Sequence, residues 1–122
     1  MINREILLAA VMDSRDGITI SDSSLPDNPL VFVNPAFERM TGYLLEDIEG
    51  KNCRFLQGND KKQEDKLNII RDAINQKKPC LVTLRNYRKD GSMFWNELSM
   101  SPIFDAQDNL IHYLSIQKDV TT

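Results

Sequence analysis

The segment LRNYRKDGSMFWNELSMSP, residues 84–102, decides the fold, because it reads as two β-strands joined by a tight turn. Aromatic, branched and polar residues alternate on both sides of a Lys-Asp-Gly sequence, which is typical of an antiparallel hairpin. A three-residue loop with Gly91 in the left-handed conformation fits this turn. We therefore predict strands near 80–88 and 93–104.

The length of the turn determines which side chains of the hairpin share a face. With a three-residue loop, Arg88 lies opposite Ser92 and Asn86 lies opposite Phe94. Asn86 and Asn96 then point to the same side of the sheet, whereas a two-residue loop would separate them.

A third strand, near 110–118, extends the hairpin into a meander. A four-residue AQDN loop pairs Asp105 with Leu110, and the same register places Leu98 opposite Gln117. Gln117 then shares the face that carries the two asparagine amides.

Three amide side chains therefore lie on one face of the predicted sheet, together with apolar neighbours. These neighbours are Val82, Leu84, Leu98 and Met100. Buried amides are costly unless a partner satisfies them, so this face predicts a ligand with a polar edge and an otherwise flat or apolar surface. The alternative is that the amides lie exposed on the outer face of the sheet, which their apolar neighbours disfavour.

The residues before the meander predict two strands and several short helices. Residues 2–12 form a short helix, and 17–22 and 29–33 form an antiparallel pair of strands. Asn34 caps a helix that begins at Pro35. Gly42 ends that helix, and a longer one within 61–78 carries an apolar stripe made of Leu67, Ile70 and Ile74. Two strands, short helices and a three-stranded meander predict an α+β fold.

Composition indicates one ordinary domain. A chain of 122 residues forms a single core, and a net charge of −3 with both signs interspersed favours neither nucleic acid nor a membrane as a partner. The apolar run at 6–12 is too short to span a membrane or to direct export, so we expect a cytoplasmic location. In that reducing compartment Cys53 and Cys80 are free thiols, and with a single histidine they provide no metal site.

The stretch GKNCRFLQGND, residues 50–60, places a thiol, a guanidinium and amides close together. Arg54, together with Arg71 on the later helix, is suited to bind a phosphate group. Each arginine alone is also compatible with an exposed surface residue. Cys53 alone is compatible with a small buried thiol or with a peroxide-reactive cysteine.

The motif GKNCRFLQG resembles the cysteine motif of LOV domains, the flavin-binding blue-light sensors of the PAS superfamily. LRNYRKDGSMFWNELSMSP and SIQKDV are similar to the closing strands of that family, and the resemblance extends from DGITISD to residue 119. It implies the PAS fold: a five-stranded antiparallel sheet with short helices on one face and an N-terminal flanking helix, enclosing flavin mononucleotide (FMN).

The resemblance also implies a role for each site residue. Cys53 is implied to form a reversible thioether with the C4a atom of the flavin after absorption of blue light. Gln117 is implied to lie near flavin N5 and O4, where its amide can reverse when N5 gains a proton. The other implied cofactor contacts are Asn52 and Gln57 to the ribityl chain, Arg54 and Arg71 to the phosphate, Asn86 and Asn96 to the pyrimidine edge, and Leu98.

We therefore predict a flanking helix at 1–14, a flavin-binding LOV domain at 15–119 and a tail at 120–122. The expected function is that of a photoreceptor and not of an enzyme. Two alternatives remain open: a PAS module that binds another ligand or a partner protein with Cys53 inert, and a redox flavoprotein.

The N-terminal helix leads to an expectation about output. Residues 6–12, ILLAAVM, are apolar around the whole circumference of a helix, whereas a helix lying on one sheet needs a single apolar stripe. We expect no effector after Thr122, and we therefore expect signalling through a homodimer that packs these helices across a two-fold axis, or through a separate signalling protein. The alternative is that the helix packs wholly within one subunit.

Overall fold

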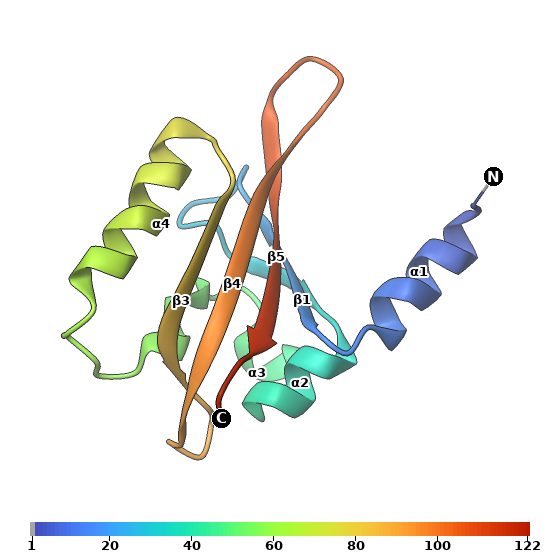
Figure 1. Cartoon of the computed structure of the whole chain (residues 1–122). Helices are drawn as coiled ribbons and strands as arrows, with labels where there is room; N and C mark the ends of the chain where they lie inside the picture. The colour runs from blue at the N-terminus through green and yellow to red at the C-terminus, as the bar shows by residue number, and fades with distance from the viewer. Residues whose placement is uncertain (1) are drawn as a thin grey trace.

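The structure, a computed structural model, describes residues 2–122 and contains a five-stranded sheet in which every strand pair is antiparallel (Figure 1). The strands are β1 (Gly17–Asp22), β2 (Leu30–Val33), β3 (Cys80–Tyr87), β4 (Met93–Phe104) and β5 (Leu110–Asp119). Their order across the sheet is β2-β1-β5-β4-β3, so the last strand in the chain is central and β3 is a free edge. The predicted sheet is confirmed.

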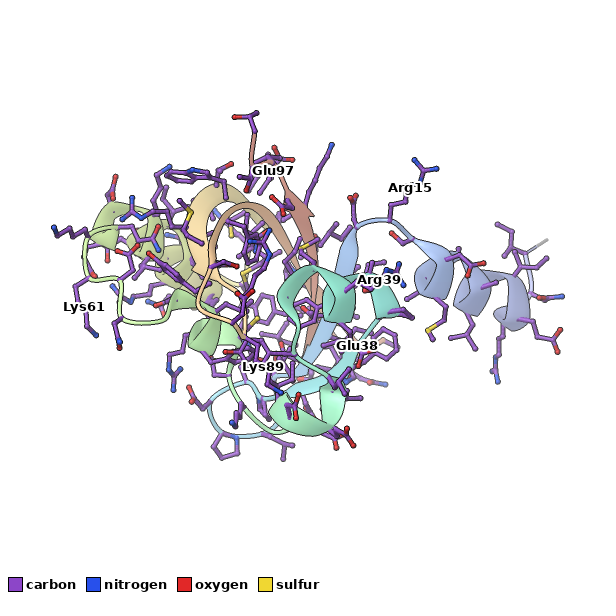
Figure 2. The ribbon with its side chains drawn as sticks, turned by 90° about the horizontal axis from the view of Figure 1, so that it is seen from below. Arg15, Glu38, Arg39, Lys61, Lys89 and Glu97 are labelled. Carbon is purple, nitrogen blue, oxygen red and sulfur yellow. The ribbon has the colours of Figure 1, made fainter. Side chains whose placement is uncertain are left out.

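Short helices connect β2 to β3 and lie beside the sheet. They are α2 (Pro35–Thr41), α3 (Leu45–Ile48), the 3₁₀-helix η1 (Cys53–Gln57) and α4 (Glu64–Gln76). Helix α1 (Arg4–Asp13) extends away from the rest of the chain in both views of the molecule (Figures 1 and 2). Met1, at the start of the predicted flanking helix, lies outside the described residues. Among the helices of residues 2–122, none has the length and apolarity needed to cross a lipid bilayer.

Asn34 holds the N-terminal part of the fold together. Its side chain is fully buried, and Oδ1 accepts hydrogen bonds from Phe37 N (3.0 Å), as predicted for the cap of α2, and from Ile18 N (2.8 Å). Its Nδ2 donates to Val11 O (2.9 Å) and Asp16 O (3.1 Å). One amide therefore joins the end of α1, the start of β1 and the first turn of α2.

The predicted hairpin register is confirmed. Asn86 pairs with Phe94 across β3 and β4, and Leu98 pairs with Gln117 across β4 and β5. Gly91 in the turn has a φ of 89°, a left-handed conformation that favours glycine.

The predicted pairing of Asp105 with Leu110 is wrong. Phe104 pairs with Leu110, because the register shifts by one residue between Ile103 and Phe104. The turn therefore contains five residues, 105–109, in place of four. A β-bulge absorbs the extra residue beside the turn, so the pairing of Leu98 with Gln117 is unaffected.

The interior contains two separate apolar clusters. The cluster nearer β2 and the short helices consists of Leu30, Val33, Phe37, Ile48 and Leu56. The cluster nearer α4 and β3 consists of Leu67, Val82 and Leu84, with Ile70 and Leu98 packed against it. The space between the two clusters is the candidate site.

Candidate cofactor site

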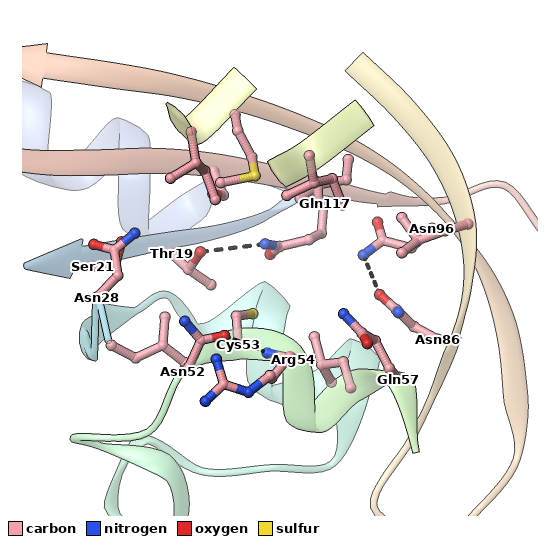
Figure 3. A pocket seen from close by; sticks show the side chains of 18 residues that line it. Thr19, Ser21, Asn28, Asn52, Cys53, Arg54, Gln57, Asn86, Asn96 and Gln117 are labelled. Carbon is pink, nitrogen blue, oxygen red and sulfur yellow. Dashed lines mark hydrogen bonds between the residues drawn. The ribbon is translucent and has the colours of Figure 1, made fainter. Parts of the chain in front are cut away.

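A cavity lies between the two apolar clusters, with about 670 Å³ of space between protein atoms, part of it open to solvent. Figure 3 shows η1 on one side of this cavity and the amides of the sheet on the other. The predicted site residues that line it are Asn52, Cys53, Arg54, Gln57, Asn86, Asn96, Leu98 and Gln117.

The two asparagines form a connected pair on the sheet wall. Asn96 Nδ2 donates to Asn86 Oδ1 (2.8 Å), and Asn86 Nδ2 donates to the backbone oxygen of Arg85 (2.9 Å). Both side chains are buried, yet Asn96 Oδ1 has no hydrogen-bond partner within residues 2–122. This wall therefore offers an acceptor to a donor inside the cavity.

Gln117 presents a second unsatisfied acceptor on the same wall. It is buried, and its Nε2 donates to Thr19 Oγ1 at 3.3 Å, while Oε1 has no partner in the described chain. A Cβ at Gly17 would lie 3.3 Å from this oxygen and 3.2 Å from Phe37 Cα, so a side chain there would displace the amide. An unpaired buried acceptor costs about 1–3 kcal/mol, which favours a ligand that donates to it.

Cys53 lies across the cavity from these amides, at the first residue of η1. Asn52 caps this helix, because its Oδ1 accepts from Arg54 N at 3.0 Å. The thiol packs against the apolar cluster that contains Leu30 and Phe37, and this burial raises the pKa of Cys53 to about 12. At neutral pH the group is therefore a protonated thiol, which disfavours the peroxide-reactive alternative, since that chemistry needs a thiolate.

The two predicted phosphate ligands reach one hollow that adjoins the cavity. Arg54 lines both spaces, whereas Arg71 lines only the adjoining hollow. Arg54 Nη1 donates to Asp27 Oδ1 at 2.8 Å, and this hydrogen bond raises the pKa of Arg54 and lowers that of Asp27. Arg71 pairs with Glu64 on its own helix. The hollow is thus lined by two cations and one anion, which suits an anionic group.

Sequence reasoning missed several polar residues of the cavity. They are Thr19, Ser21 and Asn28. In β1, Thr19 and Ser21 face the cavity, while Ile18 and Ile20 alternate with them and face the other side of the sheet. The alternation of polar and apolar residues in this strand was visible in the sequence. It did not identify the cavity-facing residues, because apolar residues ordinarily face the interior.

The chemistry of the cavity lining suits a flavin. The lining includes the apolar side chains Leu30, Leu56, Ile70, Ile74, Leu84 and Leu98. A flavin ring is flat and largely apolar, with donors and acceptors along its pyrimidine edge, and the orphaned oxygens of Asn96 and Gln117 need a donor. The arginine-lined hollow next to it suits a phosphate.

A comparison with protein families matches residues 15–122 to the PAS domain. The chain therefore belongs to the PAS domain family.

Similar proteins narrow the class further. The chain is 48% identical over 118 residues to a blue-light photoreceptor of Listeria monocytogenes, covering 97% of this chain and 46% of that protein. Among solved structures, an RNA-binding light-oxygen-voltage receptor is 42% identical with a TM-score of 0.90, covering 96% of this chain and 32% of that one. A light-oxygen-voltage domain studied with a flavin analogue is 36% identical with a TM-score of 0.86, covering 99% and 87%.

Within the PAS family the chain is a light-oxygen-voltage (LOV) domain, as the sequence motifs predict. Its relatives support a role in sensing blue light and imply a flavin chromophore. The chain spans less than half the length of the Listeria photoreceptor, and RNA binding is a property named for the receptor of which it covers about a third.

Proposed function

We propose that this domain binds FMN and reports blue light through a reversible bond between Cys53 and the flavin. The observation that carries this proposal is the arrangement of the cavity: a protonated thiol on one wall faces buried amide oxygens without partners on the other. A ligand that donates hydrogen bonds to this amide wall lies beside the thiol.

The choice of FMN over other flavins rests on the charges near the opening. Arg54 and Arg71 line the hollow next to the cavity and provide donors for a terminal phosphate. Asn52 and Gln57 line both spaces and are therefore suited to the ribityl chain that joins ring to phosphate. Asn86, Asn96 and Leu98 contact the ring in this proposal.

When bound, FMN would supply the absorption of blue light and a carbon atom that accepts a sulfur. The Cys53 thiol would supply both that sulfur and a proton to the flavin, so neither an oxidant nor a reductant would be consumed, and return in the dark would reverse both transfers. Gln117 responds at the other wall, because its amide can exchange donor and acceptor ends according to the protonation of N5. The apolar cluster around Cys53 keeps the thiol protonated until light arrives.

An absorbance spectrum tests the proposal. The purified domain is expected to be yellow, to bleach under blue light and to recover in darkness. Cys53→Ala is expected to retain the flavin but to fluoresce persistently and not to bleach. Normal reversible bleaching of Cys53→Ala contradicts the role of the thiol. A colourless parent protein favours a module that binds another ligand or a partner protein. A yellow parent protein that bleaches only with reductant favours a redox flavoprotein.

We also propose that the signal reaches a dimer interface on the outer face of the sheet and on α1. Gln117 and Ile116 are neighbours on β5 and point to opposite sides of the sheet. On the outer face, Ile116 pairs with Ile18 and Leu114 pairs with Ile20. This apolar strip and the exposed apolar residues of α1 favour a second copy of the chain as partner.

The exposure of α1 supports this dimer. No residue of α1 is buried, and Ile6, Leu7 and Leu8 are 55%, 55% and 59% exposed. Light scattering coupled to size exclusion, in darkness and under blue light, is expected to show a dimer that Leu7→Glu weakens. A monomer in both states, unaffected by Leu7→Glu, would leave a separate signalling protein as the partner. In either case this domain serves as a sensor and does not turn over a substrate.

A further inference from the structure

The residues that follow η1, the helix that carries Cys53, are hydrogen-bonded to the edge strand β3. Gln63, at the start of α4, is only 4% exposed. Its Oε1 accepts from Arg85 N and its Nε2 donates to Arg85 O, both at 2.8 Å. These backbone groups belong to edge strand β3 and point away from β4, so the amide of Gln63 takes the place of a neighbouring strand.

Asp60 makes a second attachment to the same strand. Its carboxylate accepts from Arg85 Nε (2.6 Å), Arg85 Nη2 (3.0 Å) and the hydroxyl of Tyr87 (2.8 Å). The side chain is 5% exposed, and its hydrogen bond to Arg85 holds the pKa of Asp60 well below its usual range. The carboxylate therefore remains charged, and paired, at any physiological pH.

Gly58 brings the backbone of the segment against β3. Its φ is 56°, and a Cβ at this position would lie 3.2 Å from Cδ2 of Tyr87. Both the conformation and the close approach to the ring require glycine. Residues 58–63, which we call the edge clasp, thus contact β3 through Gly58, Asp60 and Gln63.

The edge clasp joins the two walls of the cavity. On one side it follows η1 directly, the helix that carries Cys53. On the other side it shares an acceptor with the amide wall, because Arg85 O accepts from both Gln63 Nε2 and Asn86 Nδ2. Asn86 in turn accepts from Asn96. The hydrogen bonds therefore run without interruption from the clasp to the amides that face the thiol across the cavity.

We propose that Gln63 and Asp60 are positioning residues, which set the separation between the Cys53 thiol and the flavin held by the amide wall. This inference rests on the proposed function. Gln63 and Asp60 together make five hydrogen bonds to Arg85 and Tyr87 of β3. Loss of the clasp lets η1 move relative to the amides, and a misplacement of about 1 Å can reduce a reaction by about a hundredfold.

The test compares Gln63→Met, which keeps the length of the side chain without its amide, with Asp60→Asn, which removes the charge. Asp105→Asn, in the turn between β4 and β5, is the matched control. Both clasp variants are expected to retain flavin, while the yield of the Cys53 bond per absorbed photon falls at least about threefold and flavin fluorescence rises. Gln63→Glu keeps an acceptor for Arg85 N and is expected to give an intermediate yield. The control keeps the parental yield.

Parental yields in Gln63→Met and Asp60→Asn overturn the inference, as does an equal fall in Asp105→Asn. If Gln63→Met does not fold, the yields of the Cys53 bond in Gln63→Glu and Asp60→Asn test the inference in its place. Hydrogen exchange provides a readout that needs no light. The backbone amide of Arg85 is expected to exchange faster in Gln63→Met than in the parent protein. An unchanged exchange rate of this amide overturns the proposed role of Gln63. A parent protein that binds flavin but does not bleach contradicts the proposed function instead.

Discussion

Replacement of Gln117 by leucine is expected to affect the flavin-free and the flavin-bound protein in opposite directions. In the flavin-free protein the amide oxygen is buried and has no partner among residues 2–122, and the amide nitrogen makes one long hydrogen bond, 3.3 Å, to Thr19. Leucine has nearly the same volume as glutamine and removes the unpaired oxygen. In the proposed flavin complex the same substitution removes a hydrogen bond to the flavin.

The magnitudes follow from these contacts. Removing the orphaned oxygen relieves a desolvation cost of about 1–3 kcal/mol, and losing the bond to Thr19 gives back about 0.5–1.5 kcal/mol. We therefore expect the free energy of unfolding of the flavin-free Gln117→Leu protein to be unchanged or about 1 kcal/mol higher. The lost contact to flavin lowers FMN affinity by about 0.5–1.5 kcal/mol, which is roughly two- to tenfold in Kd.

Two measurements check this prediction. Urea unfolding of the flavin-free parent and Gln117→Leu proteins gives the difference in stability, and calorimetric titration with FMN gives the difference in affinity. Gln107→Leu makes the same chemical change at an exposed position in the turn before β5, and is expected to alter neither quantity.

The opposite pattern would refute the reasoning. If flavin-free Gln117→Leu lost more than about 2 kcal/mol of stability while its affinity for FMN stayed at the parental value, the amide would be part of the core and not of a ligand-binding wall. The unpaired oxygen would then require a partner other than a flavin.

Three further predictions concern other parts of the domain. Substitution of Arg54 and Arg71 together by glutamine is expected to reduce the preference for FMN over riboflavin at least about tenfold, since each charge-assisted hydrogen bond contributes about 1.5–3 kcal/mol; an unchanged preference in titrations refutes the phosphate role. Asn34→Ala is expected to lower the free energy of unfolding in urea by about 2–4 kcal/mol, and Asn34→Asp, which keeps both accepted hydrogen bonds, by less. Equal losses would show that the donated bonds contribute nothing. Burial raises the pKa of Cys53 to about 12, so the thiol stays protonated between pH 6 and 9, roughly the range around an ordinary cysteine pKa of 8.5. Alkylation of Cys53 in the dark is therefore expected to be slow in this range. Rapid labelling at pH 8 would contradict the burial of the thiol.

Local sequence signals predicted most of the secondary structure, because they act over a few residues. The cap at Asn34, the turn glycine at position 91 and the alternation of the last three strands depend only on neighbours in the chain. The shared face of Asn86, Asn96 and Gln117 follows from turn length and strand periodicity alone. A bulge next to the last turn altered one pairing without changing that face.

Tertiary structure decided the features that depend on distant segments. Ile18 and Ile20 in β1 face outward and Thr19 faces the cavity, because the adjacent strand β5 places Gln117 on that side and the amide needs a polar neighbour. The pKa of Cys53 depends on how the cluster around η1 buries the thiol, which no local pattern encodes.

Sequence determined that a thiol, guanidiniums and amides occur in one domain, since motifs and periodicity are properties of the chain itself. Only the three-dimensional arrangement determined that η1 and the amide wall face each other, and that Gln63 and Asp60 fasten the segment after η1 to β3. The physical reason is that hydrogen bonds between residues more than twenty positions apart form only once the sheet has brought its free edge beside that segment.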